Sequence, residues 1–173
     1  MDKIRIGILT ASDRASKKVY ADESGKVIEG YLNDNIANEI EVNYLLVPDN
    51  FEDIKRGIVR LCDKADSHLV LTTGGTGPSP RDITPEATEA ACMKILPGFG
   101  EQMRAESLKF VPTAILSRQT AGVRGQSLVV NLPGKPKAIK QCLDAIFGAI
   151  PDCLKILSGE TIELKNSKSK IYH

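Results

Sequence analysis

The chain has 173 residues and a formal net charge of +1, and its aromatic residues are four tyrosines and four phenylalanines. This length allows one domain with a substantial core but is short for two. The near-neutral charge and the scarcity of aromatic residues argue against a nucleic-acid partner. No apolar run approaches the roughly 18 residues of a membrane span, so we expect no membrane partner either.

The first half of the chain alternates strand-like and helix-like patterns. Ile4, Ile6 and Ile8 recur at every second position, which predicts a strand with one buried face. The second of two helical patterns follows Asp49 or Asn50, either of which could be its N-cap. The predicted elements are a strand at Lys3–Thr10, a helix at Ser24–Ile36, a strand at Glu41–Val47 and a helix at Glu52–Ala65.

The second half opens with a short apolar run, Leu69–Thr73, which has the length of a buried strand. Thr84-Pro85 is typical of an N-cap followed by the first helical residue. The remaining predicted elements are helices at Pro85–Lys94 and Gly100–Val111, a strand at Ser127–Leu132, and helices at Pro136–Ile146 and Pro151–Leu157.

This order of elements predicts the α/β class, with three α/β/α layers and a mostly parallel central sheet. We expect a single domain over residues 1–160 and a short polar C-terminal tail over residues 161–173. The carboxyl ends of parallel strands lie at one edge, where open α/β sheets bind ligands. The segments expected along this rim are Ser12-Asp13-Arg14, Asp49, 74–82 and 131–135.

The most informative segment is the glycine-rich loop TTGGTGPSPRDIT at 72–84. Gly74, Gly75 and Gly77 remove side chains from a loop at a strand end, so a phosphate can approach backbone N–H groups directly. The segment matches neither the GxxxxGK[ST] phosphate loop nor the GxGxxG dinucleotide fingerprint. We therefore predict an anion-binding loop of another kind, with Arg81 and Asp82 beside it.

Asp49 and Asp82 are the carboxylates that stand out at this rim. Each also has a structural explanation, because Asp49 could cap a helix and Asp82 could belong to a turn. Two carboxylates at one rim can share Mg²⁺ with phosphate oxygens, so magnesium is the candidate metal. Candidate hydroxyl donors are Ser12, Thr73, Thr76 and Ser117, and candidate phosphate partners are Arg14, Arg81, Arg118 and Lys135.

Histidine and cysteine usage narrows the chemistry. His68 precedes a strand and His173 is the last residue, so neither suggests a catalytic triad or a zinc site. The four cysteines are widely spaced without a CxxC pair, which favours reduced thiols, core packing and a cytoplasmic location. Carboxylates, hydroxyls, backbone amides and basic side chains must then carry any catalysis.

Six strings along residues 3–157 resemble one known family when taken together. They are RIGILTASDRAS at 5–16, LVPD at 46–49, TTGGTGPSPRDITPEAT at 72–88, PGFGEQMR at 97–104, FVPTAILSRQ at 110–119 and NLPGKPKAI at 131–139. In this order they resemble the MogA-type molybdopterin adenylyltransferases of the MoaB/Mog family of molybdenum-cofactor biosynthesis proteins.

The resemblance implies a homotrimer that transfers AMP from MgATP to the terminal phosphate of molybdopterin and releases pyrophosphate. It also implies that a downstream molybdenum-insertion protein takes the product. The family's catalytic aspartates, which are also the candidate Mg²⁺ ligands, fall on Asp49 and Asp82. The implied binding residues for substrate and phosphate are Ser12, Asp13, Thr73, Gly74, Gly75, Thr76, Gly77, Arg81, Ser117, Arg118, Asn131, Pro133, Gly134 and Lys135.

Two alternatives stay open from the sequence. The chain could hold molybdopterin as a carrier without adenylylating it, although a pure binder would not need the two aspartates. It could instead be a nucleotide pyrophosphohydrolase on the same fold. The scarcity of histidine fits adenylyl transfer, because a phosphomonoester nucleophile has a second pKa near ~6 and needs no histidine base.

Overall fold

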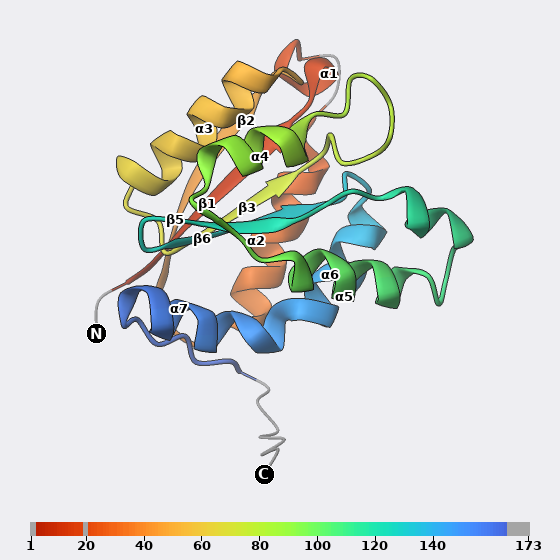
Figure 1. Cartoon of the computed structure of the whole chain (residues 1–173). Helices are drawn as coiled ribbons and strands as arrows, with labels where there is room; N and C mark the ends of the chain where they lie inside the picture. The colour runs from red at the N-terminus through yellow and green to blue at the C-terminus, as the bar shows by residue number, and fades with distance from the viewer. Residues whose placement is uncertain (1–2, 19–20, 166–173) are drawn as a thin grey trace.

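The computed structural model describes residues 3–18 and 21–165, and within these residues six strands form one sheet (Figure 1). The strand order is β2-β1-β3-β6-β5-β4. The parallel strands are β1 (Ile4–Ala11), β2 (Ile40–Val47), β3 (Leu69–Thr73) and β6 (Ser127–Leu132), while β5 (Ala121–Arg124) runs antiparallel to both β6 and β4 (Lys94–Ile95). The predicted α/β class with a mostly parallel sheet is confirmed.

Helices cover both faces of the sheet (Figure 1). The helices are α1 (Asp13–Ser16), α2 (Glu23–Asn35), α3 (Phe51–Asp63), α4 (Thr84–Ala91), α5 (Pro97–Ser107), α6 (Pro136–Ile146) and α7 (Ile150–Ser158), with 3-10 turns η1 (Pro112–Leu116) and η2 (Phe147–Ala149). Helices α3 and α4 lie on one face, and α2, α5, α6 and α7 lie on the other. Among the described residues, none of these helices combines the length and apolar character needed to cross a bilayer.

The alternation along β1 assigns its side chains to the two layers. Ile4, Ile6 and Ile8 pack into the larger apolar cluster with α2, α6 and α7. Leu9 and Ala11 face the smaller cluster with α3 and α4. Full burial of each large aliphatic side chain stabilises the fold by about 1.5–3 kcal/mol, so the two faces together fix the strand register. The predicted placement of Ile4, Ile6 and Ile8 on one face is confirmed, and the other face of β1 is buried as well.

The chain after α7 returns to the body of the protein. Ile162 is buried, Leu164 forms an antiparallel bridge with Ile36, and the Lys165 N–H donates to the Asn35 carbonyl at 2.9 Å. Residues 161–165, which the sequence assigns to the polar tail, therefore pack against the domain. The rest of that tail, 166–173, lies outside the described residues.

Several boundaries differ from the sequence expectation. The helix predicted over Pro85–Lys94 ends at Ala91, since the next residues pair with β5 through Met93 N–H to Val123 O at 2.8 Å. Strands β4 and β5 were not predicted, because two and four residues are too short for a periodic signal. The helix predicted over Gly100–Val111 runs over Pro97–Ser107, with Pro97 in the first turn.

The start of α4 also differs from the expected capping pattern. Ile83 holds the N-cap position, Thr84 is the first helical residue and Pro85 is the second, so Thr84 is not the cap. The Thr84 Oγ1 is buried and has no hydrogen-bond partner within the described part of the chain. This hydroxyl lies directly under the glycine loop, because a Cβ on Gly75 would collide with it.

Candidate active site at the carboxyl ends of the parallel strands

The loops after β1, β2, β3 and β6 meet at one edge of the sheet. The Gly74 N–H donates to the Leu132 carbonyl at 3.3 Å, which joins the glycine loop to the end of β6. A Cβ on Gly134 would stand 3.6 Å from the Gly74 Cα, so these two loops touch. The Ser12 N–H donates to Val47 O at 2.9 Å and joins the ends of β1 and β2. The loops at the carboxyl ends of the parallel strands therefore contact one another and form one continuous rim, as the parallel sheet predicts.

Asp13 and Asp49 bind each other's backbone at this rim. The Asp13 N–H donates to Asp49 Oδ2 at 3.1 Å, and the Asp49 N–H donates to Asp13 Oδ1 at 2.9 Å. The capping function that Asp49 could have served belongs to Asn50, whose side chain accepts from the Asp53 N–H at 2.9 Å. The Asp49 carboxylate therefore faces the rim rather than the first turn of α3.

The electrostatics of Asp49 reflect its neighbours. Burial raises the pKa of its carboxyl, and the negative charges of Asp13 and Asp82 raise it further, while the Asp13 N–H and the Arg81 guanidinium lower it. Arg81 forms an ion pair with Asp13 and is 74% exposed. The carboxylates of Asp13, Asp49 and Asp82 thus lie together at this part of the rim, which favours a cationic or metal-bearing ligand.

Two glycines of the loop adopt backbone conformations that other residues reach with strain. Gly74 has φ +93° and Gly75 has φ +66°. A Cβ at Gly74 would collide with the Ala11 carbonyl oxygen, and one at Gly75 would stand 3.5 Å from Asp49 Oδ1. The third glycine, Gly77, would place a Cβ 2.8 Å from Asp82 Oδ2. The glycines therefore bring the loop backbone directly against the two candidate aspartates.

Asp82 closes the turn that follows the glycine loop. Its N–H donates to the Ser79 carbonyl at 2.9 Å, and its Oδ2 accepts from the Ser79 N–H at 3.0 Å. The turn explanation for Asp82 is thus present in the structure. Asp82 nevertheless lies at the rim, because its carboxylate is beside Gly77 and close enough to Asp49 to contribute to the raised pKa of that residue.

Arg118 braces the loop from the other side. Its Nε donates to Gly77 O at 2.8 Å, its Nη2 donates to Asp82 O at 2.8 Å, and it forms an ion pair with Glu86. The hydrogen bond from Arg118 lowers the pKa of Glu86. Arg118 was expected to bind phosphate, but these donors hold the loop carbonyls and the first turn of α4. Arg118 therefore supports the loop, while its side chain stays 37% exposed and its contact with phosphate remains a prediction.

Thr73 and Asn131 lie inside the protein rather than on the rim surface. The Thr73 hydroxyl donates to Pro133 O at 2.8 Å. The Asn131 Nδ2 donates to Thr72 Oγ1 at 3.0 Å and to Thr88 Oγ1 at 2.8 Å. Both side chains are fully buried, so they shape the strand ends from within. Their contact with substrate remains a prediction.

A cavity of about 260 Å³ opens beside the glycine loop, between η1 and the start of α6. The expected residues that line it are Thr76, Gly77, Ser117, Pro133, Gly134 and Lys135. The residues that sequence reasoning missed are Ser107, Val111, Thr113, Ala114, Gln119, Ala138, Gln141 and Cys142. They come from α5, η1, the residues on either side of η1, and α6, and only folding brings them together. Gln119 is the last residue of the FVPTAILSRQ string, and this string is the sequence signal that points to it.

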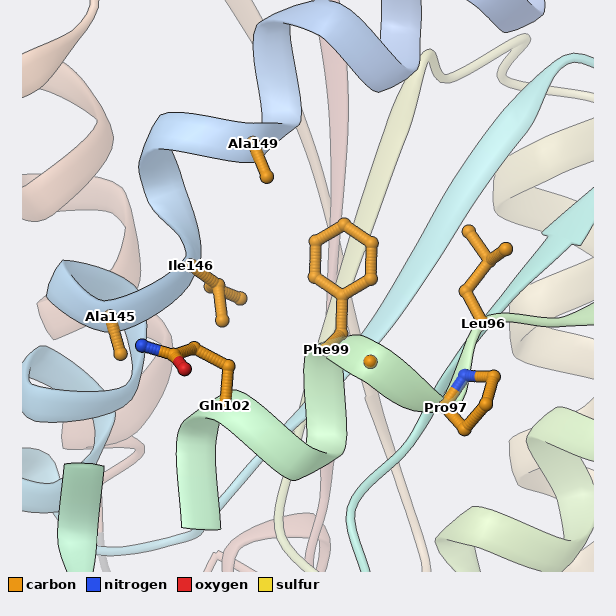
Figure 2. Close-up of a pocket in the computed structure, with 8 residues that line it drawn as sticks. Leu96, Pro97, Phe99, Gln102, Ala145, Ile146 and Ala149 are labelled. Carbon is orange, nitrogen blue, oxygen red and sulfur yellow. The ribbon is translucent and has the colours of Figure 1, made fainter. Parts of the chain in front are cut away.

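A larger and more apolar pocket of about 360 Å³ lies at the far end of α6 (Figure 2). Phe99 points into it between Leu96 and Ala149 (Figure 2). The other lining residues are Pro97, Gly98, Gln102, Ala145 and Ile146. Its lining offers no charged group to a phosphate, so it is a poor candidate for the chemistry of the rim. His68 is also remote from the rim: it is buried, and its Nδ1 accepts from the Arg5 N–H at 3.2 Å.

The rim alone does not present a complete metal site. Across residues 3–18 and 21–165, no group of three or more His, Cys, Asp or Glu side chains is arranged to hold a metal ion. The oxygen donors present are the carboxylates of Asp13, Asp49 and Asp82, which are the hard ligands that Mg²⁺ prefers. Any magnesium here would need oxygens from a bound ligand as well.

The fold and this rim define the class: an α/β domain that binds phosphate-bearing ligands at the carboxyl ends of its strands. The family model described as a probable molybdopterin binding domain matches residues 7–152. The chain belongs to this family.

Named relatives are similar in sequence to this chain over nearly its whole length. The molybdopterin adenylyltransferase of Helicobacter pylori is 52% identical over 172 residues, covering 99% of this chain and 98% of the relative. The molybdopterin adenylyltransferase of Escherichia coli K12 is 45% identical, covering 94% and 90%. Among solved structures, the molybdopterin biosynthesis enzyme MoaB of Thermus thermophilus matches with a TM-score of 0.84 and 39% identity, covering 92% of this chain and 99% of that one.

Proposed function

We propose that this protein transfers AMP from MgATP to the terminal phosphate of molybdopterin, forming adenylyl-molybdopterin and pyrophosphate. The observation that carries the proposal is the 52% identity to a molybdopterin adenylyltransferase over 99% of the chain. The geometry supports it, since the glycine loop, Asp49 and Asp82 lie together beside a cavity at the strand ends.

The reaction is a nucleotidyl transfer between two anions. An oxygen of the molybdopterin phosphate attacks the α-phosphorus of ATP, and a new oxygen–phosphorus bond forms. The bond from that phosphorus to the bridging oxygen breaks, and pyrophosphate leaves with the electron pair. The attacking phosphomonoester is largely ionised at neutral pH, because its second pKa is near ~6. The protein therefore has to align the two substrates rather than remove a proton.

The chain's own groups would offset the repulsion between these anions. Helices α3, α4 and α6 all begin at the rim, and each N-terminus carries a partial positive charge of about half an elementary charge. The backbone of Gly74–Gly77 is free of bulky side chains, so a phosphate can lie against it. Arg81 and Lys135 add cationic side chains at the two sides of the loop. Charge stabilisation by fixed groups of this kind is the main catalytic effect in phosphoryl chemistry.

Asp49 and Asp82 are the residues we propose to hold Mg²⁺ with its nucleotide. The fit rests on chemistry, because the oxygens of both residues are hard ligands. Burial and, to a smaller extent, the charges of Asp13 and Asp82 raise the pKa of Asp49, and a bound cation would relieve the repulsion among these carboxylates. Magnesium supplies shielding of phosphate charge when it is bound. Substrate phosphate oxygens would provide the ligands that the protein itself lacks.

The two alternatives are less well supported. A carrier without adenylylation would bind molybdopterin without releasing pyrophosphate, and a nucleotide pyrophosphohydrolase would cleave nucleotides without pterin. The relatives at 44–52% identity are molybdopterin adenylyltransferases, which favours neither alternative.

The remaining parts of the functional proposal concern assembly and location. We propose a homotrimer and a downstream molybdenum-insertion protein as the acceptor of the product, both on the family resemblance. A cytoplasmic location is supported by the four cysteines, all of which are unpaired.

The test is pyrophosphate release from MgATP by the purified protein, with and without molybdopterin. We expect release only when pterin is present, and a fall of at least a hundredfold in kcat for Asp82→Asn with the Kd of molybdopterin nearly unchanged. Asp34→Asn, on the exposed side of α2, is the matched control and should behave as the wild type. Pterin binding without pyrophosphate would indicate a carrier, and pterin-independent cleavage would indicate a hydrolase.

A further inference from the structure

The cavity beside the glycine loop has an unusual set of buried polar side chains in its wall. Ser107 on α5, Gln119 before β5 and Cys142 on α6 all line it and are all buried, and we call these three residues the cavity floor. Cys142 also belongs to the larger apolar cluster of the core. The floor therefore presents buried polar atoms at the point where the cavity meets the apolar core.

Gln119 is the least satisfied residue of the floor. It is 2% exposed, and its Oε1 has no hydrogen-bond partner among the residues that the structure describes. Its Nε2 has a weak contact with Cys142 Sγ at 4.0 Å. The Ser107 Oγ meets the same sulfur at 3.7 Å. Buried amides normally have their donors and acceptors paired, so an unpaired acceptor at a cavity wall indicates a missing partner.

The backbone of Gln119 is held firmly while its amide is not. Arg104 Nη1 donates to the Gln119 carbonyl at 2.9 Å. Gly100 allows this close approach, because a Cβ there would collide with the same carbonyl. The terminal amide can still turn about its last single bond, whose torsion is broad. Gln119 is therefore fixed at the cavity wall with an amide that is available to pair with a ligand.

We propose that the Gln119 amide recognises the pyrimidine edge of the pterin ring, as a specificity residue for the substrate of the proposed function, on which this inference rests. Thr76 and Gly77 belong to the glycine loop and also line the cavity. A ligand with its phosphate at the loop can therefore place its ring system in the cavity. A glutamine amide offers one donor beside one acceptor. The pterin edge presents the complementary pair, a ring carbonyl beside a ring N–H. Among the described residues lining the cavity there is no carboxylate that could serve instead.

The first test compares Gln119→Met with the wild type. Methionine has a similar length but neither donor nor acceptor, so the Kd of molybdopterin should rise by about tenfold or more, while the Kd of MgATP stays within about twofold. The melting temperature should be unchanged or higher, because an unpaired buried amide has been replaced by an apolar side chain. Gln126→Met, exposed in the turn between β5 and β6 at the opposite edge, is the matched control.

The second test needs no variant. The wild-type protein is loaded with molybdopterin and titrated with pterin or with 2-aminopteridine, which lacks the ring carbonyl and the adjacent N–H. We expect pterin to displace molybdopterin at about one tenth of the concentration that 2-aminopteridine requires. Equal displacement by the two rings would overturn the inference.

The outcomes separate this inference from the proposed function. If Gln119→Met has a wild-type Kd for molybdopterin, or if only its melting temperature falls, Gln119 is a structural residue and the inference is wrong. Pterin-dependent pyrophosphate release by the wild type would leave the proposed function standing in that case. A wild-type protein that does not bind molybdopterin would contradict both.

Discussion

Replacing Asn131 with leucine tests whether this predicted substrate-binding residue stabilises the fold or binds the substrate. Asn131→Leu keeps the size of the side chain but removes two hydrogen bonds, to Thr72 Oγ1 and Thr88 Oγ1. It also removes the acceptor of the Thr120 N–H, which donates to Asn131 Oδ1 at 3.3 Å. The site is fully buried, so water cannot replace these partners.

The expected loss in the free energy of unfolding can be estimated from these hydrogen bonds. Each lost hydrogen bond is worth about 1 kcal/mol, and the orphaned Thr120 N–H costs about 1–3 kcal/mol more. The added apolar burial of leucine offsets part of this, which leaves a net loss of about 2–4 kcal/mol. With a urea m-value of about 2 kcal/mol/M, the unfolding midpoint should fall by about 1–2 M.

Urea unfolding followed by circular dichroism measures this shift, and equilibrium dialysis of molybdopterin below the transition measures binding. We expect reduced stability with a Kd within about threefold of the wild type. Asn33→Leu, an exposed position on α2, should change neither quantity. Normal stability combined with lost pterin binding would refute the reasoning, because Asn131 would then act on the substrate.

Three further predictions concern the loop, the rim and a core thiol. Gly75→Ala should lower stability by about 1–3 kcal/mol, because φ is +66° and Thr84 fills the Cβ position, whereas Gly30→Ala, with open space on α2, should stabilise; thermal melting distinguishes them. The Asp49→Asn variant should have a higher melting temperature than the wild type at pH 7. The pKa of Asp49 is raised in the folded protein, so its ionised carboxylate destabilises the fold above that pKa. The difference in melting temperature should therefore disappear near pH 4. Burial raises the pKa of Cys62 to about 11, so a disulfide reagent at pH 8 should modify it slowly unless the protein is denatured.

The parallel half of the sheet could be predicted because its strands carry a strong local signal. Ile4, Ile6 and Ile8 alternate, and Leu69–Thr73 is a compact apolar run next to a glycine loop. Strands β4 and β5 have no such signal, and they form because Gly122 lets the chain at Cys92 approach closely. The pairing of β4 with β5 joins residues about 30 positions apart, which single-sequence patterns do not register. Strand β5 also pairs with β6 across the short turn at Gly125-Gln126, but its four residues carry no periodic pattern.

The candidate site was predictable at the level of segments and less so at the level of side chains. The topology alone brings Asp49 and the glycine loop to one rim, and the structure places them there. It takes side-chain geometry to show that Asn131 is fully buried and that Arg118 donates to the loop carbonyls, since buried and exposed polar residues look alike in a sequence. Gln119 was overlooked for the same reason, because an unpaired amide is a property of the folded cavity.

The most direct test of the account follows the α-phosphate of ATP. The purified protein is incubated with molybdopterin and Mg²⁺, in parallel with ATP labelled at the α- or the γ-phosphate, and the pterin product is separated after a single turnover. If the protein transfers AMP, α-label will be found in the pterin product and γ-label only in pyrophosphate. Alpha-label recovered entirely as free AMP, or γ-label on the pterin, would contradict adenylyl transfer.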